Sequence, residues 1–249
     1  MTVSSRSTSV WRAAVGSTAN RARRSKLAFF VNRRRLRIAS RCGGPEGVIR
    51  AAPRIDHRLV ALSYDDGPSP QNTPELLEIL AANEARATFF LVGSEVIRYP
   101  GLTTEISAGG HEIGNHSFSH ADPRALDADR LRSEVERTGE AIANAGAVTS
   151  FFRPPFGKRS HLTDQVCGEL GLDTVLWSVD SGDTLGFSAT RIAAHVIRHI
   201  RPGDIVLMHD GGGRRQRSLD ATRTILSQLG KQGYRFVTVS ELLERGGGR

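Results

Sequence analysis

Two adjacent carboxylates, Asp65 and Asp66, follow a short apolar run in the segment YDDGP, and two histidines, His116 and His120, are spaced as H-x-x-x-H. A catalytic divalent metal needs about three protein ligands and an open position for water, and Asp66 with the two imidazoles would supply them. Each piece alone is a weak signal, because Asp-Asp-Gly-Pro is good turn chemistry and histidine pairs are common. Their combination indicates a metal site.

The residues left outside this ligand set also point to hydrolysis. Asp65, Arg153 and His209 could provide a base, a group that tunes the base, and an acid. The adjacency of the two carboxylates then has a mechanical reason, since Asp66 can hold the metal while Asp65 reaches the water that the metal activates. The histidine spacing is not H-E-x-x-H, so a zincin protease is not indicated.

The elements that must position these residues can be read from the hydrophobic pattern. From residue 59 onward, short apolar runs alternate with segments of helical period. Strands are predicted at 59–64, 87–92, 112–115, 150–152, 174–178, 204–208 and 235–237, and helices at 72–82, 94–108, 127–145, 161–171, 188–200 and 217–231. This alternation predicts an α/β fold with a parallel sheet, and the count of seven strands favours a barrel. In such folds the chemistry lies just after the strands, where these residues stand.

Five motifs occur in a fixed order: LSYDDGPS, HEIGNHSFSH, RPPFG, WSVDSGD and IVLMHD. With ATFFLVG and RFVTVSELL, they resemble the polysaccharide deacetylases of the NodB-homology type, carbohydrate esterase family 4. The resemblance covers about residues 58–246. It implies a distorted, incomplete (β/α) barrel of about seven parallel strands. It also implies a metal-dependent hydrolase that removes N-acetyl groups from N-acetylglucosamine-containing glycans, of chitooligosaccharide or peptidoglycan type, and releases acetate.

The resemblance further implies a role for each matching residue. Asp65 would be the general base, and Arg153 would orient it and keep it ionised. His209 would be the acid that protonates the leaving amine, and Asp183 would set its charge state. The implied metal ligands are Asp66, His116 and His120, for zinc first, with cobalt or nickel as alternatives.

Three residues are implied to contact the substrate, namely Pro155, Phe156 and Leu207. The backbone N–H of Phe156 would stabilise the oxyanion, and Leu207 would line the pocket for the acetyl methyl group. Thr184 departs from the pattern, because many members have a Trp there as a wall for sugar rings. This keeps open a small non-carbohydrate amide or imide as the substrate. A non-catalytic glycan-binding module is a third possibility. The presence of the base, the ligands, the arginine and the acid argues against it.

Charge divides the chain into two parts. The net charge is +8, but residues 1–58 carry 14 Lys and Arg against two acidic residues, and the remainder is slightly acidic. We therefore expect residues 1–57 to be a basic, disordered extension and residues 58–246 to be the catalytic domain. Nucleic acid is not expected as the main partner. Binding of nucleic acid or an acidic membrane by the extension alone should depend steeply on salt.

Signals for localisation are weak. The longest apolar run of the extension, 27–31, is too short for a secretory signal, and Arg23-Arg24 is only a faint twin-arginine hint. No stretch approaches the roughly 20 apolar residues of a membrane span. These features favour the cytoplasm and leave the cell envelope or secretion open, and the sequence does not specify the oligomeric state. Cys42 and Cys167 are expected to be free thiols.

Overall fold

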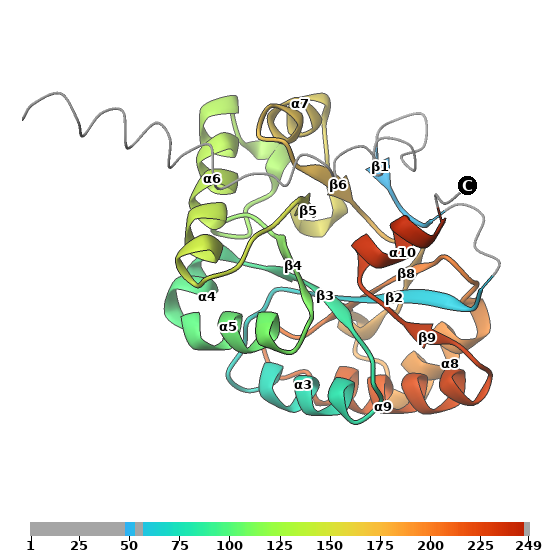
Figure 1. Ribbon diagram of the computed structural model, residues 1–249. Helices are drawn as coiled ribbons and strands as arrows, with labels where there is room; N and C mark the ends of the chain where they lie inside the picture. Colours follow the sequence, from blue (N-terminus) through green and yellow to red (C-terminus); the bar gives the residue numbers. More distant parts are fainter. Residues whose placement is uncertain (1–47, 53–56, 247–249) are drawn as a thin grey trace, which may run out of the picture.

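The computed structural model describes residues 48–52 and 57–246, which form an α/β unit (Figure 1). The strands are β1 (Val48–Ile49), β2 (Leu59–Asp65), β3 (Ala87–Leu91), β4 (Glu112–Asn115), β5 (Phe151–Phe152), β6 (Asp173–Val175), β7 (Val179–Asp180), β8 (Ile205–His209) and β9 (Arg235–Phe236). The helices are α3 (Thr73–Ala81), α4 (Gly93–Arg98), α5 (Pro100–Ala108), α6 (Ala128–Asn144), α7 (His161–Glu169), α8 (Ala189–His199), α9 (Gln216–Lys231) and α10 (Val239–Gly246). Three short 3-10 turns are η1 (Pro123–Ala125), η2 (Pro155–Gly157) and η3 (Asp183–Leu185).

The strands form one parallel sheet in the order β1-β6-β5-β4-β3-β2-β8-β7, with β9 paired to the start of β2. Every strand pairing in it is parallel. The predicted incomplete barrel is therefore confirmed, and all seven predicted strands are present. Two short strands were not predicted. β7 follows Trp177 and Ser178 so closely that β6 and β7 read as one run, and β1 lies in the predicted extension.

Five of the six predicted helices match within two residues, and the sixth is divided. The segment predicted as one helix over 94–108 forms α4 and α5, separated at Tyr99, whose φ of −132° and ψ of 58° are not helical. Pro100 explains the break, because its ring disfavours a helical conformation for the preceding residue. α10 was not predicted as a helix.

The side chains of β2 alternate between two apolar layers. Val60, Leu62 and Tyr64 belong to the larger core cluster, which includes residues of α3, α8 and α9. Leu59 and Ala61 belong to a second cluster, with Leu242 and Leu243 of α10. Figure 1 shows α3, α8 and α9 together along one side of the molecule. Because side chains alternate along a strand, Ser63 and Asp65 share the face of Leu59 and Ala61.

The start of the folded unit differs from the prediction. Val48 and Ile49, within the predicted extension 1–57, are buried in β1, which pairs with β6. The N–H of Leu176 donates to the carbonyl of Ile49 at 2.8 Å. The boundary at residue 58 is corrected to include 48–52, because a two-residue apolar run gives no periodic signal of its own. The rest of the extension and Cys42 lie outside the described residues, and Cys167 is a buried free thiol. No helix in the described ranges has the length and apolarity to cross a bilayer.

Candidate functional site

The predicted site residues come from five segments at the carboxyl end of the sheet. Asp65 is the last residue of β2 and His209 the last of β8, and the two stand opposite each other in register. His116 follows β4 directly, and Arg153 follows β5. Asp183 begins η3. The structure thus brings together residues that are far apart in the chain.

Asp66, His116 and His120 form one cluster, in which a ligand atom from each lies within 4.8 Å of the others. Oδ1 of Asp66 lies 3.5 Å from Nε2 of His116 and 3.1 Å from Nε2 of His120. Nδ1 of His116 is 2.7 Å from the backbone carbonyl of Arg153. A carbonyl can only accept, so Nδ1 carries the proton and the lone pair of Nε2 faces the cluster, as a metal ligand requires.

The chemistry of these three donors fits a divalent metal. Oδ1 of Asp66 is buried and, within the described chain, accepts no hydrogen bond of good geometry. Burial by itself would raise the pKa of Asp66, but the two histidines outweigh it and hold the pKa well below its usual range. An ionised carboxylate oxygen without a donor, facing two imidazole nitrogens, is the environment a cation would complete.

Arg153 and Asp65 form a buried ion pair. Nη1 of Arg153 lies 2.7 Å from Oδ1 of Asp65 and also donates to the Ser63 hydroxyl at 2.9 Å. The other guanidinium nitrogens donate to the carbonyls of Val175 and Leu176. Burial lowers the pKa of Arg153, and the charge and hydrogen bond of Asp65 oppose that shift. A guanidinium stays charged under these conditions, so it fixes one oxygen of Asp65 and leaves Oδ2 on the side of His116, 3.7 Å from its Nε2.

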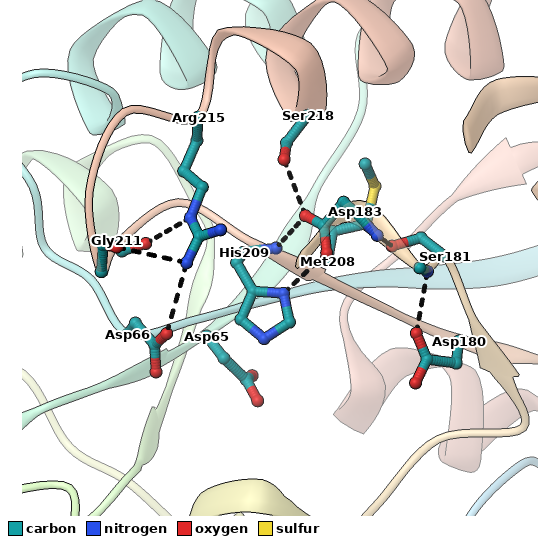
Figure 2. Close-up of polar contacts among 12 residues, drawn as sticks. Asp65, Asp66, Asp180, Ser181, Asp183, Met208, His209, Gly211, Arg215 and Ser218 are labelled. Atoms are coloured by element: carbon teal, nitrogen blue, oxygen red, sulfur yellow. Dashed lines mark hydrogen bonds and ion pairs between the residues drawn. The ribbon is translucent and has the colours of Figure 1, made fainter. Parts of the chain in front are cut away.

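His209 is held by Asp183, as Figure 2 shows. Nδ1 of His209 is 2.8 Å from Oδ1 of Asp183, and the backbone N–H of His209 donates to Oδ2 at 2.9 Å. Burial would lower the pKa of His209, but the hydrogen bond and charge of Asp183, with the charges of Asp65 and Asp66, raise it overall. Burial would raise the pKa of Asp183, but its hydrogen bonds with His209 and Ser218 lower it overall. The pair therefore favours an imidazolium beside a carboxylate.

The candidate substrate residues lie around this centre. Phe156 is 58% exposed, and its ring packs edge-on against His120 with centroids 4.6 Å apart. Its φ of 61° is left-handed, a costly conformation for a residue with a side chain that is found most often at functional sites. Pro155 is buried beside it in η2. Leu207 is buried two residues before His209 on β8, so its side chain points to the same face of the sheet. Thr184 is exposed.

Four residues near the centre were not predicted as part of the site. The hydroxyl of Ser63 accepts a hydrogen bond from Nη1 of Arg153, which also binds Asp65, and the hydroxyl of Ser218 donates to Oδ2 of Asp183. Nε of Arg215 donates to the carbonyl of Gly211 at 2.6 Å, and its Nη2 lies 3.9 Å from Oδ2 of Asp66 (Figure 2). Burial raises the pKa of Asp210 to about 7. Ser63 could have been found from its place two residues before Asp65, whereas the others depend on the tertiary fold.

Comparison with known proteins gives consistent matches. The family model described as polysaccharide deacetylase matches residues 53–175. A peptidoglycan-N-acetylglucosamine deacetylase of Bacillus cereus is 37% identical over 201 residues, which cover 80% of this chain and 94% of that protein. A chitooligosaccharide deacetylase of Bradyrhizobium is 37% identical over 169 residues, covering 66% and 77% of the two chains.

Solved structures share the fold. The crystal structure of the Bc1960 peptidoglycan N-acetylglucosamine deacetylase superposes with a TM-score of 0.76 at 33% identity, covering 82% of this chain and 95% of that one. A Bacillus anthracis protein, described as a pseudoenzyme of carbohydrate esterase family 4, superposes with a TM-score of 0.74 at 28% identity, covering 80% and 69%. The same architecture thus occurs in enzymes and in at least one inactive relative.

Proposed function

The chain belongs to the polysaccharide deacetylase family, and we propose that it is a metal-dependent hydrolase that removes N-acetyl groups from N-acetylglucosamine-containing glycans. One observation carries this proposal. The Asp66–His116–His120 cluster, the Arg153–Asp65 pair and the Asp183–His209 pair occupy the same end of the sheet. They provide the ligand set, the base and the acid that amide hydrolysis requires.

The three ligands would hold a divalent metal, for which zinc suits two imidazoles and a carboxylate, and cobalt or nickel would also fit. When bound, the metal supplies Lewis-acid polarisation of the acetamide carbonyl and of water. Asp65 accepts the proton of the attacking water, while Arg153 holds the carboxylate in place. The backbone N–H of Phe156 donates to the developing oxyanion.

His209 completes the reaction on the leaving-group side. Its Nδ1 is engaged by Asp183, so Nε2–H is the proton available to the substrate nitrogen. As the C–N bond breaks, this proton goes to the nitrogen, which leaves as a free amine, and the acetyl carbon keeps the water oxygen as acetate. Leu207 packs against the acetyl methyl group.

The substrate is assigned by analogy with the relatives, which act on peptidoglycan and on chitooligosaccharides as their names state. The exposed Thr184, in place of the aromatic residue common in the family, favours a second candidate, a small non-carbohydrate amide or imide. A non-catalytic glycan-binding module is the remaining alternative, since an inactive relative shares the fold.

Mass spectrometry of the reaction products separates these candidates. The full chain loaded with Zn²⁺ is incubated with peptidoglycan fragments, with a chitooligosaccharide ladder and with small acylated amines. Deacetylation lowers the substrate mass by about 42 Da per acetyl group, the change expected for hydrolysis of the acetamide. Loss from either glycan supports the proposal, loss only from the small amides supports the second candidate, and glycan binding without any mass change supports the binding module. The Asp65→Asn variant is the matched inactive control.

A further inference from the structure

Ser218 lies behind the Asp183–His209 pair, in the first turn of α9. Its side chain is buried, and its hydroxyl donates to Oδ2 of Asp183 at 2.7 Å. The same oxygen accepts the backbone N–H of His209, and Oδ1 faces Nδ1 of His209. Figure 2 shows Ser218, Asp183 and His209 in one continuous line of contacts. Both oxygens of this carboxylate are therefore fixed from two different elements.

We infer that Ser218 is a positioning residue for the general acid, holding Asp183 so that His209 presents Nε2–H to the leaving nitrogen. The inference rests on the proposed function, in which His209 is the acid. Rotation of the carboxylate about the Cβ–Cγ bond would take Oδ1 away from Nδ1 of His209. The hydroxyl of Ser218 and the backbone N–H of His209 both act on Oδ2, which opposes that rotation.

A neutral donor is suited to this role. Within the described part of the chain, the ion pair of Asp183 is with His209. A Lys or Arg in place of Ser218 would hold the carboxylate equally well but would neutralise its charge and weaken its hold on the imidazolium. A hydroxyl orients Asp183 and leaves its charge for His209. The N-terminal end of α9, where backbone N–H groups point outward, favours the same ionised form.

The other charges around His209 come from β2 and from the loop after β8. Asp65 and Asp66 act on His209 from the end of β2, and Asp210 follows it in the chain. Arg215, the nearby cation of the loop, is turned to the carbonyl of Gly211 and to Asp66. Among the described residues, the hydroxyl of Ser218 and the backbone N–H of His209 both hold Oδ2 of Asp183, and a substitution of Ser218 removes the first contact alone. Its effect can therefore be separated from the effects of these charges.

Three variants of the full chain test the inference. Ser218→Ala removes the hydroxyl, Ser218→Thr retains it, and Thr224→Ala removes an exposed hydroxyl that bonds the Asp220 carbonyl on the same helix. For Ser218→Ala we expect kcat to fall about 10-fold with KM unchanged, as for a lost hydrogen bond to a charged acceptor. The basic limb of the rate profile should move to lower pH by about half a unit or more. Ser218→Thr should restore the position of that limb, and Thr224→Ala should match the wild type.

A second measurement does not depend on turnover. The imidazole of His209 is titrated by NMR in the Zn²⁺-loaded chain, with His209→Gln identifying its signal. The midpoint should fall in Ser218→Ala and not in Thr224→Ala, while Zn²⁺ affinity stays unchanged. A Ser218→Ala protein with the wild-type midpoint and kcat would overturn the inference. If Ser218→Ala does not fold, Ser218→Cys takes its place, being of similar size and a weaker donor. Failure of the proposed function would instead appear as absent turnover in all variants, with the difference in midpoint intact.

Discussion

The two neighbouring carboxylates of YDDGP have different surroundings because their backbones differ. Asp65 ends β2 in the extended conformation and points to the inner face, where Arg153 binds it. Asp66 has a left-handed φ of 73°, which turns its side chain toward the two histidines. An Asp tolerates this conformation better than most residues with a side chain. One change of backbone conformation thus separates the proposed base from the proposed metal ligand.

These separate surroundings predict separate mutational effects. Asp65→Asn should lower kcat by roughly 10³-fold, within the range for loss of a general base, and leave metal binding intact. His116→Ala should lose the metal, because it removes one of the three proposed ligands. Acetate release and metal content per chain measure the two effects, with the exposed Asp220→Asn as a surface control. Full activity in Asp65→Asn would exclude Asp65 as the base.

The rate should depend on pH with a bell shape. A base that must be deprotonated and an acid that must be protonated give the two limbs of such a profile. His209 must be protonated, so activity is full below its pKa and is lost as the pH rises through it. Because the pKa of His209 is raised above the usual 6.5, this loss should begin at a higher pH than for an ordinary histidine.

Asp183→Asn gives the matching test of the basic limb. It removes the charge that raises the pKa of His209, so the limb should move to lower pH and kcat should fall. A profile of kcat against pH for both proteins measures the shift. An unchanged basic limb in Asp183→Asn would mean that another group controls it.

At the level of elements, the helices and strands that could be predicted are those whose hydrophobic pattern is long enough to show a period. Both α6 and α9 have apolar residues four positions apart on one buried face. These are Leu131 and Val135 in α6, and Ile225 and Leu229 in α9. The candidate residues could be found for a related reason, since each lies at or near the end of a strand in a motif of distinct chemistry. β1 and β7 have two residues each, and such a length shows no alternation. β5 and β9 are equally short, but each falls within a run predicted as a strand, at 150–152 and 235–237. The place of β1 and β7 is decided by pairing with β6 and β8, which the local sequence does not record.

The loop after β8 is tightly packed against Asp66 at one glycine. A Cβ on Gly211 would lie 1.9 Å from the carbonyl oxygen of Asp66, so Gly211→Ala must displace that backbone. We expect lower thermal stability and weaker metal binding, because the displaced residue is a proposed ligand. Gly230→Ala on α9 is the control: it meets nothing within 4 Å and should raise the free energy of unfolding by about 0.5–1 kcal/mol. Chemical denaturation and metal titration of both variants test the difference, and equal behaviour would contradict it.

At the scale of the whole molecule, the corrected boundary can be tested by truncation. All described contacts of the site lie within 57–246, so a chain beginning at residue 48 should keep its activity. A chain beginning at residue 58 lacks β1, which buries Val48 and Ile49 against β6. Loss of that burial should lower the free energy of unfolding by roughly 2–4 kcal/mol. Thermal and denaturant unfolding of the two truncated chains measure it, and equal stability would restore the boundary at 58.

The strand partners of β1 and of β2 also have a consequence for how the chain reaches this structure. β2 pairs with β3 nearby in sequence, but its other neighbours are β8 and β9, and Ala51 after β1 bridges to Asp204. β1 and β2 are synthesised early, and they can therefore form some of their strand contacts only when the chain is almost complete. Contacts of such long range make folding slow and leave strand edges exposed during synthesis. The segment 53–175 that matches the family model lacks β8, β9 and His209, so it should not fold or act as an independent unit.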